Sequence, residues 1–97
     1  MTIVVPHTQT QEEARKRMEG LILQLKEKYG DQIHGFREHW TGNTNTVEGS
    51  AKGFSTTGKF TVTSSTVDIE VKLPFALKLF AGKIRSVVEE KVKTALG

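Results

Sequence analysis

Cysteine is absent from this chain of 97 residues. Without thiols the chain has no disulfide framework and no thiolate metal site, which suits a reducing compartment. No apolar run approaches the roughly 20 residues that a membrane-spanning helix needs. The opening residues, MTIVVPH, also lack the basic start and long apolar region of a signal peptide. We therefore expect a cytoplasmic protein with no membrane span.

Motifs of catalysis and of metal or phosphate binding are also missing. No G-x-S-x-G elbow occurs, and Gly49 and Gly53 alternate along an expected strand instead of opening a helix as a phosphate loop does. Glu38 would have a raised pKa if it were buried, but a water-exposed position at a sheet rim is the simpler interpretation. None of the three histidines has a metal-ligand spacing with a nearby carboxylate; they are His7, His34 and His39. We therefore predict no enzymatic activity, no metal and no cofactor, and we interpret His7 as a support for the turn before the first helix.

Positive charge is concentrated near the end of the chain. The net charge is +3, and residues 76–97 carry five basic and two acidic side chains. Cations near a helix C-terminus are favourable, whereas nucleic-acid binding usually needs a denser basic patch with interleaved aromatic residues. The basic side chains in question are Lys78, Lys83, Arg85, Lys91 and Lys93. We interpret them as a solvated helix face and expect no nucleic-acid partner.

The length and the 36% hydrophobic content indicate one globular domain over residues 1–97 with one modest core. A first helix is predicted over residues 11–29. Thr10 and Glu13 have the spacing of a capping box, and Gly30 is a natural stop. The apolar residues that repeat at helical spacing are Ala14, Met18, Leu21, Ile22, Leu25 and Tyr29. Leu23 falls on the opposite, charged side and is expected to be exposed.

Alternating side chains predict five strands. They are expected at residues 2–5, 33–40, 47–53, 59–63 and 67–73, with turns at 41–45 and 55–58. Around Phe36 and Trp40 the intervening Glu38 shares their face, which indicates a half-buried face or a bulge. The inward residues of the third strand are small, which favours a close helix or a bend in the sheet.

A second helix is predicted over about residues 77–95. Pro74 ends the preceding strand because proline has no N–H group for the sheet. The expected buried stripe consists of Leu77, Phe80, Ile84, Val87, Val88 and Ala95. Leu79 and Gly82 lie outside this stripe, and no physical reason for a glycine at position 82 is apparent.

The order of elements is therefore β–α–β–β–β–β–α, and the fold class is α+β. Four consecutive strands with short turns form an antiparallel meander, and the first strand extends the sheet at an edge. The outer face is polar, so we expect two layers with both amphipathic helices packed on the other face.

Two segments resemble a known family, namely VVPHTQTQEEARKRMEGLILQLKEKYG and VDIEVKLPFALKLFAGKI. The marks of the resemblance are His7, Glu13-Ala14-Arg15, Tyr29-Gly30 and Phe80-x-Gly82-x-Ile84. They are similar to those of the putative polyhydroxyalkanoic acid system proteins, small bacterial proteins associated with polyhydroxyalkanoate granule gene regions. Family members often have proline before the phenylalanine, where this chain has Leu79. The resemblance covers nearly the whole chain and transfers no catalytic residues.

The resemblance implies a non-enzymatic accessory protein of polyhydroxyalkanoate metabolism that associates with granules or with a granule protein. The candidate interaction surface consists of Phe75, Leu77 and Leu79 with Lys78 and Lys83, because one helical stripe cannot bury all three apolar side chains. Alternatively, Leu79 packs against the first strand or a second subunit, and a homo-oligomer is compatible with the sequence.

The alternative function is a carrier of a small apolar ligand. The ligand would lie between the sheet and the C-terminal helix, where the small residues Gly49, Ala51 and Gly53 leave space.

Overall fold

The computed structural model describes all residues 1–97 and contains five strands, two α-helices and one 3-10 helix. The elements in order are β1 (Thr2–Pro6), α1 (Gln11–Tyr29), β2 (His34–Thr41), β3 (Thr44–Ala51), β4 (Phe54–Val62), β5 (Thr66–Lys72), η1 (Phe75–Phe80) and α2 (Ala81–Leu96). The predicted order of strands and α-helices is confirmed, and the first helix has the predicted bounds. The 3-10 helix η1 was not predicted.

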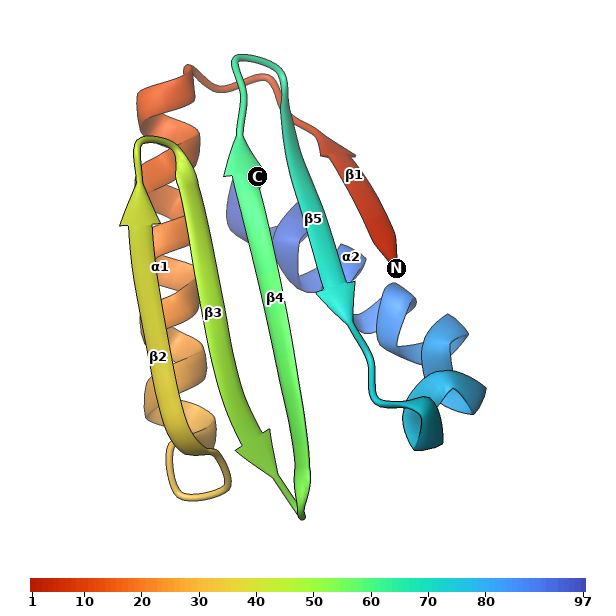
Figure 1. Cartoon of the computed structure of the whole chain (residues 1–97). Helices are drawn as coiled ribbons and strands as arrows, with labels where there is room; N and C mark the ends of the chain where they lie inside the picture. The colour runs from red at the N-terminus through yellow and green to blue at the C-terminus, as the bar shows by residue number, and fades with distance from the viewer.

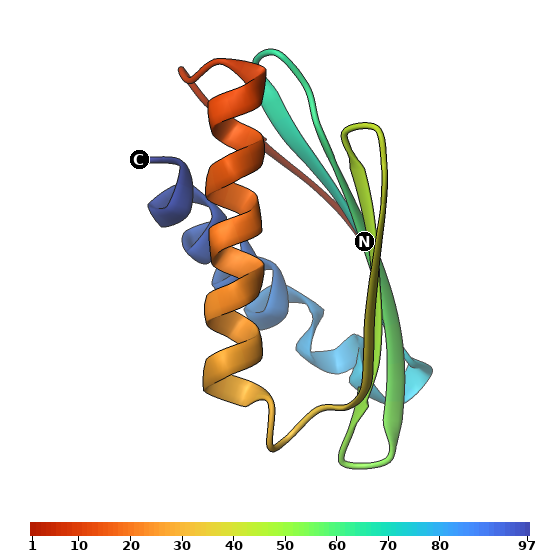
Figure 2. The same ribbon diagram turned by 90° about the vertical axis from the view of Figure 1, so that its left-hand side faces the viewer.

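The strands form one antiparallel sheet in the order β1-β5-β4-β3-β2 (Figure 1). The first strand lies at an edge, as predicted, where Val5 is the register partner of Val67. Viewed along the sheet, α1 and α2 lie on the same side of it (Figure 2). The structure therefore confirms the two-layer α+β fold, with one covered and one uncovered sheet face.

The core lies where the two helices meet β1, β5 and β4. Ala14, Met18 and Leu21 of α1 and Val92 and Leu96 of α2 are buried there. The sheet contributes Ile3, Val5, Phe60, Val62, Val67 and Ile69. Because the buried residues of α2 lie near its end, the beginning of that helix adds little to the core.

The start of α1 forms half of the predicted capping box. The Glu13 N–H donates to Thr10 Oγ1 at 3.1 Å, as predicted. The Glu13 carboxylate instead accepts a hydrogen bond from Arg17 Nε at 3.2 Å, one helical turn away. Just before the helix, His7 accepts from the Gln9 N–H and its other ring nitrogen lies 3.1 Å from the Thr63 carbonyl. His7 therefore supports this turn, as predicted.

The turn between β3 and β4 differs from the prediction. It consists of Lys52 and Gly53, whose φ angles are 53° and 82°, and residues 55–58 lie inside β4. Two central residues with positive φ fit the tight hairpin turn whose twist matches that of antiparallel strands. Gly53 therefore supplies a turn conformation instead of an inward strand position, and Phe54 joins the inward row of β4.

The second helix was also predicted to begin too early. Residues 75–80 form η1, and α2 begins only at Ala81. A 3-10 helix has 3.0 residues per turn, so the apolar stripe of an α-helix cannot run through it in register. As a result Phe80 is 56% exposed, contrary to its predicted burial. Val87, also predicted to be buried, is exposed as well, because α2 turns the side of Val92 and Leu96 toward the core.

A polar contact joins α1 to the outer half of the sheet. A bulge with Gly35 at φ 65° precedes Phe36, and Phe36, Glu38 and Trp40 then form a half-covered row facing α1. Glu38 accepts from Lys26 Nζ and from the fully buried Asn45 Nδ2, each at 3.1 Å. Partial burial alone would raise the pKa of Glu38, but the hydrogen bonds from Asn45 and Lys26 and the lysine charge lower it below its ordinary value.

Replacing Phe60 and Phe80 by alanine should have different effects on stability. Phe60 is 5% exposed and meets Trp40 edge to face with centroids 5.4 Å apart. We expect Phe60→Ala to lower the free energy of unfolding by about 3–5 kcal/mol. Phe80→Ala should lower it by about 1 kcal/mol or less, and Leu23→Ala by less than about 0.5 kcal/mol. Urea unfolding of the three variants measures this, and equal losses for both phenylalanines would contradict the packing described.

Glu38→Gln should lower stability in a pH-dependent way. Because the pKa is lowered in the folded state, the ionised carboxylate stabilises the protein above its ordinary pKa of 4.5, and this stabilisation disappears as the pH falls through the lowered value. The difference in unfolding free energy between wild type and variant should be largest at neutral pH and shrink in acid. Glu27→Gln, at a site without an ion pair, is the control. A difference that grows toward acid would contradict the prediction.

Candidate functional site

Three large apolar side chains are exposed around η1. Phe75 is 86% exposed and Leu79 is 92% exposed, and Phe80 is the third. No residue of η1 is buried, and its backbone lies near α2 but near no strand. Figure 1 shows this segment as a separate turn beyond the end of β5. Leu79 therefore does not pack on β1, which was the alternative considered for it.

The local sequence explains why η1 leaves the sheet. Pro74 adopts φ −55° and ψ 148°, an extended conformation that ends β5. Its carbonyl accepts the Leu77 N–H at 2.9 Å, and the Lys78 carbonyl accepts the Ala81 N–H. Residues three apart eclipse in such a helix, and Lys78 Nζ accordingly lies 5.7 Å from the centroid of the Phe75 ring. Backbone hydrogen bonding thus holds the turn while the side chains of Phe75 and Leu79 face outward.

The five candidate residues separate into two groups. Phe75, Leu79 and the two cations Lys78 and Lys83 are exposed. Leu77 is half-buried and lines a groove on the sheet instead. Four of the five residues of the predicted surface are therefore exposed, whereas Leu77 lies on the inner side of η1.

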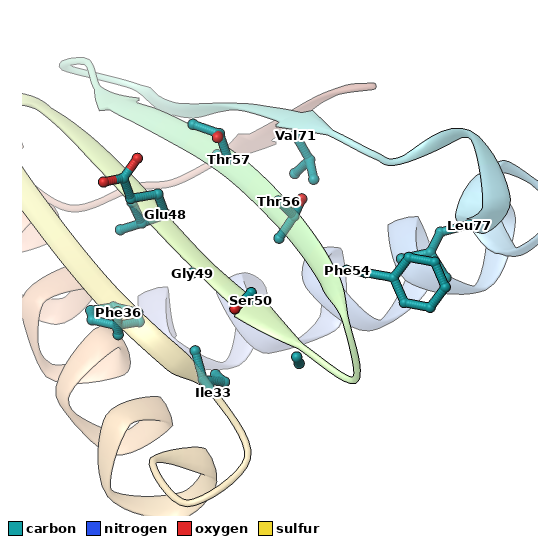
Figure 3. Close-up of a pocket in the computed structure, with 13 residues that line it drawn as sticks. Ile33, Phe36, Glu48, Gly49, Ser50, Phe54, Thr56, Thr57, Val71 and Leu77 are labelled. Atoms are coloured by element: carbon teal, nitrogen blue, oxygen red, sulfur yellow. The ribbon is translucent and has the colours of Figure 1, made fainter.

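The groove has a volume of about 320 Å³ and lies on the helix-facing side of the sheet, at the end that the helices leave partly open. Figure 3 shows Ile33 and Phe36 at one end and Phe54 with Leu77 at the other. Val47 and Val71 also line it, and its floor consists of Gly49, Ala51 and Gly58. Segments from four strands, the loop after α1 and η1 thus enclose one apolar concavity.

The absence of a side chain at Gly49 leaves room for a neighbouring side chain at the floor of the groove. A Cβ atom at Gly49 would lie 2.9 Å from Ile33 Cγ2, which is too close, whereas one at Gly58 would make ordinary contacts, the nearest side-chain atom being Val47 Cγ2 at 3.6 Å. The small side chains of β3 were interpreted as a sign of a close helix or of a bent sheet. The structure instead shows that Gly49 admits the Ile33 side chain, and that the neighbouring small residues leave space beside it.

Three of the four polar side chains along the groove, all except Thr57, already have partners. Thr56 Oγ1 donates to the Lys72 carbonyl at 2.6 Å, and Ser50 Oγ donates to the His34 carbonyl at 3.4 Å. Glu48 lies 3.8 Å from Arg37 in an ion pair. No group of three or more histidine or acidic side chains is arranged to hold a metal ion. This lining suits an apolar group that requires no hydrogen bonds.

The small residues of the groove floor are visible in the sequence, whereas most of the wall is not. Gly49 and Ala51 were identified, whereas Ile33, Phe54 and Val71 were not. Phe54 shares the parity of Phe60, and this signal becomes visible once the turn is placed at Lys52 and Gly53. Phe80 was missed as an exposed residue because the helical stripe was continued through η1.

Neither α-helix combines the length and the apolarity needed to cross a membrane. A search of the curated proteins and a search of the solved structures each returned no match. A family model described as "Putative polyhydroxyalkanoic acid system protein" matches residues 1–96. Since the match spans nearly the whole chain, this protein belongs to the family of putative polyhydroxyalkanoic acid system proteins.

Proposed function

We propose that this protein is a non-enzymatic accessory protein of polyhydroxyalkanoate metabolism that associates with granules, or with a granule-bound protein, in the bacterial cytoplasm. Family membership supports the link to the polyhydroxyalkanoate system. The observation that carries the proposal is the exposure of Phe75 and Leu79 on a turn that adds nothing to the core.

This exposure fits an attachment surface for two physical reasons. Large apolar groups in water are unfavourable, and removing them from water contributes roughly 25 cal/mol per Å². They are also bordered by the charges of Lys78 and Lys83, an arrangement that marks interaction surfaces. Because η1 contains no buried residue, these side chains are available for a partner without any change in the fold.

Leu79→Glu should weaken granule association. A carboxylate in the centre of the exposed cluster would have to be desolvated on contact, which is strongly unfavourable. Fractionation of granule-forming cells should show the wild type with the granules and a larger share of the variant in the soluble fraction. Leu23→Glu is the matched control, since Leu23 is exposed at 57% on α1, away from η1.

Two results would contradict this proposal. If the wild type stays soluble and captures no granule protein, the accessory function is wrong. If Leu79→Glu and Leu23→Glu behave alike, η1 is not the attachment surface. Size-exclusion chromatography of both variants shows whether Leu79 instead serves contact with a second copy of the chain.

The groove supports a second function, a carrier of a small apolar ligand. Its volume of about 320 Å³ lies in the range of small-molecule sites, and its lining is mainly apolar. Leu77, which was predicted to begin the C-terminal helix, lines the groove from η1, and this supports a ligand site between the sheet and that segment instead of α2 itself.

Ala51→Leu should reduce ligand binding by filling the floor of the groove. Titration with 3-hydroxyalkanoic acids of increasing chain length tests this, because each buried methylene should improve the Kd about fourfold, corresponding to about 0.8 kcal/mol. The variant should lose this dependence on chain length. Ser55→Leu, on the opposite sheet face, is the control. No dependence on chain length in the wild type would contradict the carrier function.

A further inference from the structure

All charged residues in the segment around η1 are basic. Between Glu70 and Glu89 the chain contains no acidic residue and four basic ones, which are Lys72, Lys78, Lys83 and Arg85. None of the ion pairs in the structure includes any of the four. By contrast, seven of the basic side chains elsewhere form ion pairs, mostly within a helix or across the sheet. The charge of this segment is therefore not neutralised within the molecule.

These cations lie close in the chain to the exposed apolar side chains, and the side chain of Lys72 also lines a hollow on the outer sheet face with Lys59 and Glu70. Lys72 ends β5, Lys78 lies over the Phe75 ring, and Lys83 is in the first turn of α2. Figure 1 shows the end of β5, the turn η1 and the start of α2 as one corner of the molecule. We call this corner, residues 72–85, the basic apolar corner. All four of its basic side chains and its residues Phe75, Leu79 and Phe80 are exposed.

The start of α2 places positive charge where a helix disfavours it. The first turn of a helix has positive partial charge and favours acidic side chains; in α2 the Ala81 N–H already donates to the Lys78 carbonyl, so η1 offsets part of this charge. The start of α1 follows this preference with Glu12 and Glu13, whereas the first turn of α2 has no acidic residue and carries Lys83. An external anion would relieve this unfavourable arrangement.

We propose that the basic apolar corner docks on an anionic lipid surface, with Phe75 and Leu79 inserted among the acyl chains and the four cations at the head groups. This inference rests on the proposed granule association and names the chemistry of the surface recognised. Amphipathic surfaces bind lipid by this combination of buried apolar side chains and attraction to anionic head groups. A bare polyester surface has no net charge and would leave the four cations without counter-charges.

The size of the corner favours lipid over a folded protein partner. A stable protein interface usually involves about 20–30 residues from each partner. The apolar part of this corner is a single projecting turn of six residues, which is enough to insert a few side chains into a lipid layer but not to form such an interface. The absence of acidic residues over the whole corner adds charge complementarity to an anionic layer.

Vesicle flotation with the full chain tests the proposal. The wild type should float with phosphatidylcholine vesicles that contain phosphatidylglycerol, should bind pure phosphatidylcholine vesicles far less, and should be released by salt.

Lys78→Gln with Lys83→Gln should weaken partitioning by roughly 25-fold, or about fivefold for each cation. Phe75→Ser with Leu79→Ser should abolish flotation. Lys91→Gln is the matched control, because Lys91 is an exposed, unpaired lysine outside the corner. This substitution should weaken partitioning by less than the roughly fivefold expected for one lysine of the corner.

Circular dichroism and urea unfolding confirm that the variants are folded, which their exposed positions favour. Equal binding to both vesicle types, or no binding to either, would overturn the lipid proposal. If the vesicle test fails but the Leu79→Glu substitution still moves the protein from the granules to the soluble fraction, granule association stands. The granule component that binds the protein is then not an anionic lipid. If the wild type binds anionic vesicles but not granules, the lipid surface stands and the granule function fails.

Discussion

The contact between one apolar sheet face and two helices is the constraint on which the rest of this structure depends. The sheet is too long for the helices to cover completely: α1 and the end of α2 bury β1, β5 and the end of β4 at Phe60 and Val62. The hairpin of β3 and β4 continues past this core to its turn at Lys52 and Gly53. Both candidate sites arise at this uncovered end. The groove is the part of the apolar face without a helix, and η1 is the part of the chain that connects the sheet to α2 without joining the core.

Most of the fold could be predicted from the sequence because its signals are local. The alternation in β5 and the spacing of Ala14, Met18 and Leu21 each follow from a single repeating geometry. The turn at Lys52 and Gly53 was misplaced because four consecutive small or polar residues further on, Ser55 to Gly58, also fit a turn by composition. The pairing of Ala51 with Phe54 places the turn at Lys52 and Gly53 instead of at residues 55–58. Strand pairing involves two segments of the chain, so it cannot be seen in either segment alone.

The candidate surface was also predictable in part, because part of its signal is local in the sequence. An excess of apolar residues after Pro74 is visible in the sequence, and it identified Phe75 and Leu79. Their exposure depends on where α2 begins, which was not visible, because Leu77, Phe80 and Ile84 fit an α-helical stripe as well as they fit a 3-10 turn followed by a helix. The wall of the groove combines residues 33 to 77, so no local pattern could have shown it.

Leu77 has a consequence for how the two candidate sites relate to each other. Its neighbours Phe75 and Leu79 face outward, while its own side chain lies against the groove beside Phe54. On the proposed functions, a displacement of η1 at a surface would change the volume open to a ligand, and a ligand in the groove would restrict the position of η1. Such linkage is reciprocal: the factor by which surface contact alters ligand affinity must equal the factor by which the ligand alters affinity for the surface. If both proposed functions hold, the side chain of Leu77 would couple ligand binding in the groove to attachment through η1.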